Sequence, residues 1–445
     1  MSETLPPDAN LEQLRKQAKD LLKLHNAGNP ETCGTLRLLR RFRQASDREI
    51  LASDLALNEA QFALAMSYGF KSWPELKRHV ESTRPSAHVA EMERDDGRTV
   101  LKGYEDIDWG WSRESIDNSF IRCLTHVLNA AGEDISYAEL MGLSGAAFRV
   151  QVLQPELCPS AACAEVGIDC YKPALESVGY PMETIWMQVK SDSGSMTDGT
   201  QVKADPGSMA DAAPKTIERA RKSVVESIER GRPAIYQVEE HSLIVGYRNA
   251  GQCFILREYC NTSGPGYTDK EPLPWSVSIV GDKKRTPDRR TEIIRSLRRG
   301  LEVANTAKFD NVACGFAAYK AWIQTIERGF GHLSDERAFG WLLGNAYCYE
   351  SLFNSREAAS DYLRSVSEEL DEGASDRLLK AADLFNRLQK GLHAEWSCAP
   401  YPWWITEENP WTPEKKARER QLLSEALEMD RMAFAEIEKA VAILS

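Results

Sequence analysis

The stretch from Ser119 to Gly132 contains two side chains that can act as nucleophiles. Ser119 has a hydroxyl and Cys123 a thiol, and a spacing of four residues puts both on one face of a helix. Ser119 stands at the start of this stretch, where the dipole of a helix favours negative charge. Because that field stabilises the ionised form of a nucleophile, this arrangement is a recurrent way to activate one.

Such a nucleophile needs a base, and the stretch from His241 to Tyr247 offers an imidazole at the start of an apolar run. In acyl transfer an imidazole takes the proton of the attacking serine or cysteine. Two interpretations stay open. His241 assists either Ser119, whose hydroxyl hardly ionises at neutral pH, or Cys123, whose thiol ionises more readily. A third interpretation involves no chemistry: the serine caps the helix, the cysteine fills the core and the histidine is hydrogen-bonded within its strand.

The element that carries the nucleophile is predicted to be a helix. Asp117 or Asn118 can cap its first turn, and Gly132 stands where a left-handed residue would end it. Further along, the pattern predicts a helix over 216–231 and strands over 182–189, 234–238, 241–247 and 253–256. A helix with the nucleophile, followed by an antiparallel sheet with the histidine, is the layout of a papain-like α+β domain.

The composition is that of an ordinary globular protein. The chain has 445 residues, of which 42% are hydrophobic and 27% charged, and its formal net charge is −12. This charge argues against wholesale binding to nucleic acid or to anionic membranes. No apolar run reaches the roughly 18 residues of a membrane span, and the first residues lack the pattern of a secretion signal. We therefore expect a cytoplasmic protein whose 10 cysteines are reduced thiols.

The pattern divides the chain into a small helical module over 1–84, a linker over 85–100, an α+β domain over 101–286 and a helical bundle over 287–445. A basic run, Arg37 to Arg43, lies in the first part. It would suit a helix that faces nucleic acid, but a solvated basic face is favoured because a charge run alone is weak evidence.

Three cysteines, Cys158, Cys163 and Cys170, lie close together in the sequence. Three thiols can hold zinc, but this spacing does not form a known pair of zinc knuckles, and no histidine lies nearby. A structural loop with packed thiols is the favoured interpretation. Neither a metal nor a cofactor is predicted.

The sequence resembles known families in two places. The segment from Tyr68 to Val80 resembles a helical module that precedes ankyrin repeats or other domains in many bacterial proteins. A second set of segments resembles the N-terminal domain of the butirosin-type acyltransferases and, more distantly, the papain-like peptidases that cleave double-glycine leader peptides; these segments are 119–132, 139–148, 230–233 and 241–247. The tail after residue 287 is similar to the helical region that accompanies the acyltransferase domain.

This second resemblance implies an acyl-transfer enzyme, either an acyltransferase or a hydrolase of amides or thioesters. Its substrate would be an acyl group on a small molecule, a peptide or a carrier protein. In these relatives a cysteine nucleophile stands at the position of Ser119, and a small residue at that of Cys123. His241 matches the base, and Glu258 matches the acidic residue that orients the imidazole. Asn261 can orient it by another route.

Two features depart from those families. A serine replaces the cysteine nucleophile, and Arg113 stands where the leader peptidases have the glutamine of their oxyanion hole. Loss of such a donor typically lowers the rate by about two to three powers of ten. The alternative is therefore a catalytically degenerate papain-like domain that binds a small molecule or a peptide. A further alternative is a helical interaction protein whose N-terminal module recruits a partner.

Overall fold

The computed structural model divides the chain into two compact units, Met1–Ala87 and His88–Ser445. It describes residues 11–70, 72–73, 76, 91–95, 97–105, 107, 109, 117–162, 166–187, 214–259, 266–271 and 274–444. The boundary between the two units, after Ala87, falls close to residue 84, where the predicted helical module ends. Each unit has its own hydrophobic core.

The first unit consists of short helices: α1 (Leu11–Asn26), α2 (Thr32–Leu36), α3 (Asp47–Leu51) and α4 (Leu57–Ser67). Its larger core cluster includes Leu36, Ile50 and Ala60, which are fully buried. The basic run forms only a single turn, η1 (Arg40–Phe42), rather than a long helix. Arg41 forms an ion pair of 2.8 Å with Glu59, so part of its charge is neutralised within the unit.

The second unit is built on an antiparallel sheet, as the α+β prediction requires. Its strands are β1 (Met92–Asp95), β2 (Arg98–Leu101), β4 (Met182–Trp186), β5 (Ala234–Gln237), β6 (His241–Arg248), β7 (Cys253–Arg257), β8 (Thr268–Lys270) and β9 (Ser276–Val280). They lie in the order β1-β2-β6-β5-β9-β4, with β7 pairing with β6 and β8. The four predicted strands are confirmed as β4, β5, β6 and β7, and β6 and β7 form an antiparallel hairpin.

One prediction about this unit was wrong. Residues 85–100 are predicted to be a linker, and 85–90 lie outside the described residues, but beyond them β1 and β2 form a hairpin at one edge of the sheet. β2 pairs with β6, and its last two residues, Val100 and Leu101, are buried. This apolar pair anchors an otherwise charged segment to the core.

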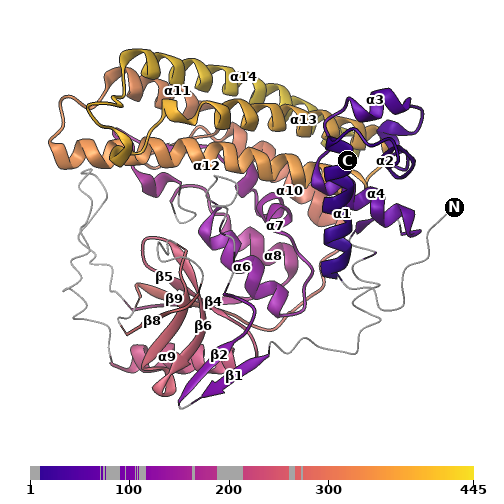
Figure 1. Cartoon of the computed structure of the whole chain (residues 1–445). Coiled ribbons are helices and arrows are strands. Elements are labelled where there is room, and N and C mark those ends of the chain that lie inside the picture. Colours follow the sequence, from indigo (N-terminus) through magenta and orange to yellow (C-terminus); the bar gives the residue numbers. More distant parts are fainter. Residues whose placement is uncertain are drawn as a thin grey trace. The chain divides into compact units, whose positions relative to one another are not determined.

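Helices cover the sheet and extend away from it (Figure 1). α6 (Ser119–Ala130), α7 (Tyr137–Ser144) and α8 (Tyr171–Val178) lie between the sheet and the long C-terminal helices, and α9 (Pro214–Glu229) packs on the sheet. A small second sheet contains β3 (Gln151–Leu153), β10 (Lys308–Phe309) and β11 (Val312–Cys314).

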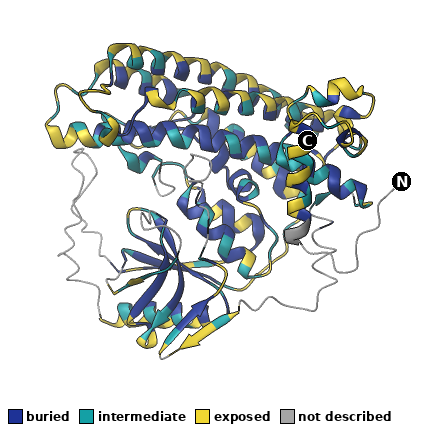
Figure 2. Cartoon of the chain, viewed as in Figure 1, coloured by how far each residue is buried: buried dark blue, intermediate teal, exposed yellow. Residues whose placement is uncertain are grey.

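The C-terminal region forms the predicted helical bundle. Its helices are α10 (Arg289–Asn305), α11 (Gly315–Arg328), α12 (Asp335–Ser367), α13 (Glu372–Ala394) and α14 (Pro413–Leu444). Exposed residues lie along the outer faces of α13 and α14, whereas most of α12 is buried (Figure 2). Among the described residues, no helix is long and apolar enough to cross a membrane.

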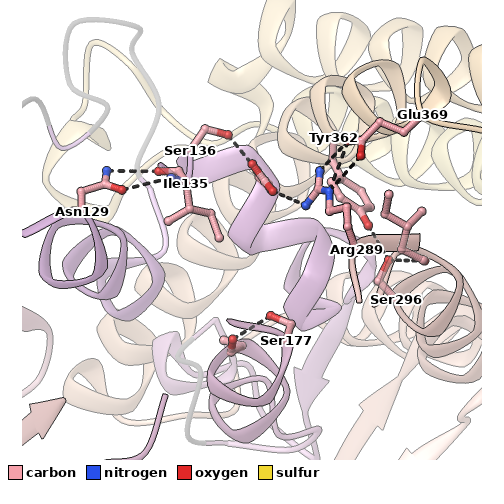
Figure 3. A network of polar contacts seen from close by, with 11 residues as sticks. Asn129, Ile135, Ser136, Ser177, Arg289, Ser296, Tyr362 and Glu369 are labelled. Atoms are coloured by element: carbon pink, nitrogen blue, oxygen red, sulfur yellow. Dashed lines mark hydrogen bonds and ion pairs between the residues drawn. The ribbon is translucent and has the colours of Figure 1, made fainter. Parts of the chain in front are cut away.

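The bundle and the α+β region share one core, so the boundary expected near residue 287 does not separate two cores. A single cluster includes Phe120 of α6 and Leu256 of β7 together with Phe385 of α13 and Phe434 of α14. Polar contacts cross the same boundary (Figure 3). Arg289 of α10 donates hydrogen bonds both to Glu139 of α7 and to Glu369 after α12.

Close packing at Gly142 gives a prediction about stability. Gly142 lies on α7 directly beneath the ring of Tyr362 from α12, and a Cβ atom there would overlap the ring. Because Tyr362 is fully buried and its hydroxyl contacts Ser296, the ring has no room to retreat. We expect Gly142→Ala to lower the free energy of unfolding by about 1–3 kcal/mol, measured by urea unfolding.

Gly391 on α13 is the matched control, since nothing lies within 4 Å of the position of its Cβ. Gly391→Ala should raise the free energy of unfolding by up to about 1 kcal/mol, through helix propensity alone. Equal responses at both positions would contradict the packing argument.

Candidate functional site

The helix α6 begins where the sequence predicts. Asn118 caps it, because its side-chain oxygen accepts a hydrogen bond of 3.0 Å from the N–H of Ile121. Ser119 is the first residue of the helix. Gly132 follows its end with a φ of 94°, which only glycine adopts readily. The cap therefore fixes Ser119 at the positive end of the helix dipole.

The structure brings Ser119 together with His241. The Ser119 Oγ lies 3.3 Å from Nδ1 of the imidazole, although 122 positions separate the two residues in the sequence. The backbone N–H of His241 also donates to this Oγ, at 3.1 Å. The spatial proximity on which the sequence hypothesis depends is therefore present.

A third residue, Glu240, also contacts the serine. The Ser119 hydroxyl donates a hydrogen bond of 2.5 Å to Oε2 of Glu240. Burial raises the pKa of this carboxyl group, and the hydrogen bond from Ser119 opposes that rise. Glu240 was not predicted from the sequence as a site residue. The one signal for it was its position immediately before His241, the candidate base. Adjacent residues of a strand face opposite sides, but Glu240 lies in the bend just before β6, where this alternation does not hold.

The other side of the imidazole faces Tyr171 of α8. The Tyr171 hydroxyl lies 3.1 Å from Nε2 of His241. The Tyr171 ring stacks on Phe120 with a centroid distance of 3.5 Å, and Phe120 meets the imidazole edge-on at 5.4 Å. Both ring nitrogens thus have a polar neighbour, while burial lowers the pKa of His241 to about 3. The imidazole is therefore neutral at physiological pH.

The second candidate nucleophile, Cys123, is in a different environment. Its side chain is fully buried within the hydrophobic cluster, and burial raises the pKa of its thiol well above the ordinary value. Nearby, His126 stacks edge-on with Tyr104 and Trp109, and burial lowers its pKa to about 4. Neither side chain lines the cavity that reaches Ser119.

Glu258 does not take the position expected from the resemblance. Its carboxylate forms an ion pair of 2.9 Å with Lys270, and Tyr171 stands at Nε2 in its place. Glu258 directly follows β7, which pairs with β8, the strand that carries Lys270; in that register Lys270 lies opposite Phe254. Asn261 and Arg113 lie outside the described residues.

A cavity of about 50 Å³ reaches Ser119. The α+β region contributes Ser119, Glu240 and Arg149 to its wall, whereas α11 and α12 contribute Trp322, Glu350 and Asn354, among others. Burial raises the pKa of Glu350 to about 7, and Tyr401 donates a hydrogen bond to its carboxylate. The bundle thus completes the site rather than only stabilising it.

A buried network holds the first turn of α6 against α7 and α12. Asp117 pairs with Arg122, whose Nε donates at 2.7 Å. Asn354 of α12 donates to the other oxygen of Asp117 at 3.4 Å, and its own oxygen accepts from the Tyr137 hydroxyl at 3.1 Å. The same hydroxyl accepts from the N–H of Asn118 at 2.7 Å. These contacts position the residue that precedes the candidate nucleophile.

The zinc alternative receives no support from the part of the chain that the structure describes. Within it, no group of three or more potential ligands comes together. Cys158 contacts Ser160, and Cys170 is buried and donates weakly to the carbonyl of Ile168. Cys163 lies outside the described residues.

Comparisons of the sequence with known proteins gave no match. No protein-family model matches the chain. No curated protein matches it either.

Proposed function

We propose that the chain is a papain-like acyl-transfer enzyme, an acyltransferase or a hydrolase of amides or thioesters, with Ser119 as its nucleophile. The observation that carries this proposal is the contact of 3.3 Å between the Ser119 Oγ and the imidazole of His241. The order of a nucleophile-bearing helix followed by an antiparallel sheet supports the papain-like assignment.

The surroundings of Ser119 favour it over Cys123. Ser119 lines the cavity and Cys123 does not. The first N–H groups of a helix have no acceptor within that helix, so those of Ser119 and Phe120 can stabilise an oxyanion that forms beside the Oγ. These N–H groups would provide hydrogen bonds to the oxyanion, which in the leader peptidases the glutamine side chain provides.

The alternative is a degenerate papain-like domain that binds a small molecule or a peptide without reaction. The feature that favours this alternative is Arg113, which stands where the leader peptidases have the glutamine of their oxyanion hole. The size of the cavity does not separate the two functions, because about 50 Å³ holds only a few water molecules. A substrate that reaches Ser119 would have to displace side chains of the wall.

Covalent labelling tests the proposal. An alkyl fluorophosphonate should label the full-length protein at Ser119, as located by peptide mass mapping, because an activated serine attacks phosphorus and expels fluoride. Ser119→Ala should abolish the label, and His241→Ala should lower its rate by about 10²–10⁴-fold.

Cys123 provides the comparison. With a thiol-reactive acyl probe, a label that maps to Cys123 and disappears in Cys123→Ala would transfer the role of nucleophile to the thiol. Absence of a label at both residues, in a protein whose thermal unfolding is cooperative, would favour the binding domain.

A further inference from the structure

The hydrogens around Ser119 can be assigned one after another. The serine hydroxyl has a single proton, and its geometry directs this proton to Glu240 at 2.5 Å. The contact of 3.3 Å between Oγ and Nδ1 of His241 then requires Nδ1 to be the donor. A neutral imidazole with its proton on Nδ1 has an acceptor at Nε2, so the Tyr171 hydroxyl donates there.

In this arrangement His241 has no lone pair facing the serine. We propose that Glu240 is the catalytic residue that takes the proton of Ser119, and that His241, held by Tyr171, is a positioning residue. This inference rests on the proposed acyl transfer at Ser119 and assigns its proton transfers.

The resulting step balances. As the Ser119 Oγ forms a bond to the acyl carbon, its O–H bond breaks and the proton moves to Oε2 of Glu240. The π electrons of the carbonyl move to its oxygen. When the tetrahedral intermediate collapses, the bond to the leaving group breaks and the proton on Glu240 moves to that group. The acceptor, an amine, an alcohol or water, then loses its proton to Glu240 as it attacks the acyl-serine. When this second intermediate collapses, the bond between the acyl carbon and the Ser119 Oγ breaks, and the proton on Glu240 returns to the Oγ.

The donors at Ser119 suit this role. Both Nδ1–H and the backbone N–H of His241 point at the Oγ, where they stabilise the negative charge that develops as the proton leaves. The raised pKa of Glu240 brings the carboxylate closer to the strength of base that proton abstraction at neutral pH requires. The low pKa of His241, by contrast, makes it a weak base.

Several ionisable groups surround Glu240, and their charges affect the pH at which Glu240 loses its proton. Glu239 precedes it in the chain and adds to the rise of its pKa. Cys123 and Tyr259 are close enough for its charge to raise their own pKa values. Asp117, Arg149 and Glu350 line the same cavity.

The test compares labelling rates of Ser119 by an alkyl fluorophosphonate in the full chain and in its variants. Glu240→Gln keeps the shape but not the basicity, and should lower the rate by about 10²–10⁴-fold. The rate for the unmodified chain should rise with pH as Glu240 loses its proton, above the ordinary 4.5 of a glutamate. That rise should be absent in Glu240→Gln. An exposed glutamate outside the site gives a control with the same change of charge, and Glu226→Gln on α9 should label at an unchanged rate.

Two variants of His241 separate positioning from proton abstraction. The amide of His241→Asn retains an N–H donor near the place of Nδ1, so this variant should keep its rate within about ten-fold, whereas His241→Ala should lose far more. An imidazole base would make both variants equally slow. If Glu240→Gln is unstable in thermal unfolding, Glu240→Asp should give an intermediate rate.

The outcomes distinguish the two proposals. Labelling of Ser119 that is as fast in Glu240→Gln as in the unmodified chain would overturn the role of Glu240 while leaving Ser119 as the nucleophile. Equal losses in His241→Asn and His241→Ala would return the role of base to the imidazole. Absence of labelling in the unmodified chain would overturn both proposals.

Discussion

Arg356→Met is expected to lower the free energy of unfolding by about 3–5 kcal/mol. Arg356 of α12 is fully buried, and its Nε donates to Asp430 of α14 at 2.8 Å while its Nη2 does so at 2.5 Å. It also donates to the carbonyl of Ala147 at 2.8 Å. The substitution would leave Asp430 as a buried charge whose only remaining donor among these is the Tyr319 hydroxyl at 2.6 Å.

Urea unfolding measures this effect, and a double variant identifies its cause. Arg356→Met combined with Asp430→Asn removes both charges, so much of the lost stability should return. Arg420→Met is the surface control, because Arg420 forms an exposed ion pair of 2.7 Å with Glu327. It should change stability by less than about 1 kcal/mol. A similar loss in both single variants would show that burial of the charge is not the cause.

The second large effect is a dependence of stability on pH that comes from Glu419. This residue of α14 is fully buried, and Asn345 donates to its Oε1 at 2.8 Å. No hydrogen-bond partner of its Oε2 is found among the described residues, and burial raises its pKa from 4.5 to about 8. The folded protein therefore keeps this proton at neutral pH, where the unfolded chain has lost it.

The sign follows from this difference in bound protons. Between pH 4.5 and about 8, the folded state holds one more proton at this site, so stability decreases as the pH rises. The contribution amounts to about 1.4 kcal/mol per pH unit. In Glu419→Gln this contribution should vanish, so the stability of the variant should decrease less steeply with pH than that of the unmodified chain.

Urea unfolding at several pH values within that window measures the two slopes. Glu425→Gln, on the same helix but at a largely exposed site, should keep the slope of the unmodified chain. An identical slope in Glu419→Gln would mean that Glu419 is ionised in the folded protein.

The local elements of the site could be predicted from the sequence. The apolar spacing and the cap of α6 are local signals, as is the apolar run of β6. The proximity of Ser119 and His241 was an expectation from a resemblance rather than from local signals, because 122 positions separate them.

Partners that are distant in the sequence could not be predicted in the same way. Glu240 and Tyr171 act through single hydrogen bonds across 121 and 70 positions, and neither belongs to a pattern that periodicity reveals. Glu258 was assigned by its place after a strand, but its carboxylate forms an ion pair with Lys270 of β8, a strand that pairs with β7. The hairpin of β1 and β2 escaped prediction because half of its strand residues are charged and its burial depends on pairing with β6.

The position of α12 has a consequence for how this chain can have evolved. Asn354 contacts Asp117 beside Ser119, and the same helix supplies part of the cavity wall. A gene fragment that encodes only the α+β region would therefore lack one side of this wall. Recombination would preserve the cavity only if it moved the whole of His88–Ser445 as one piece.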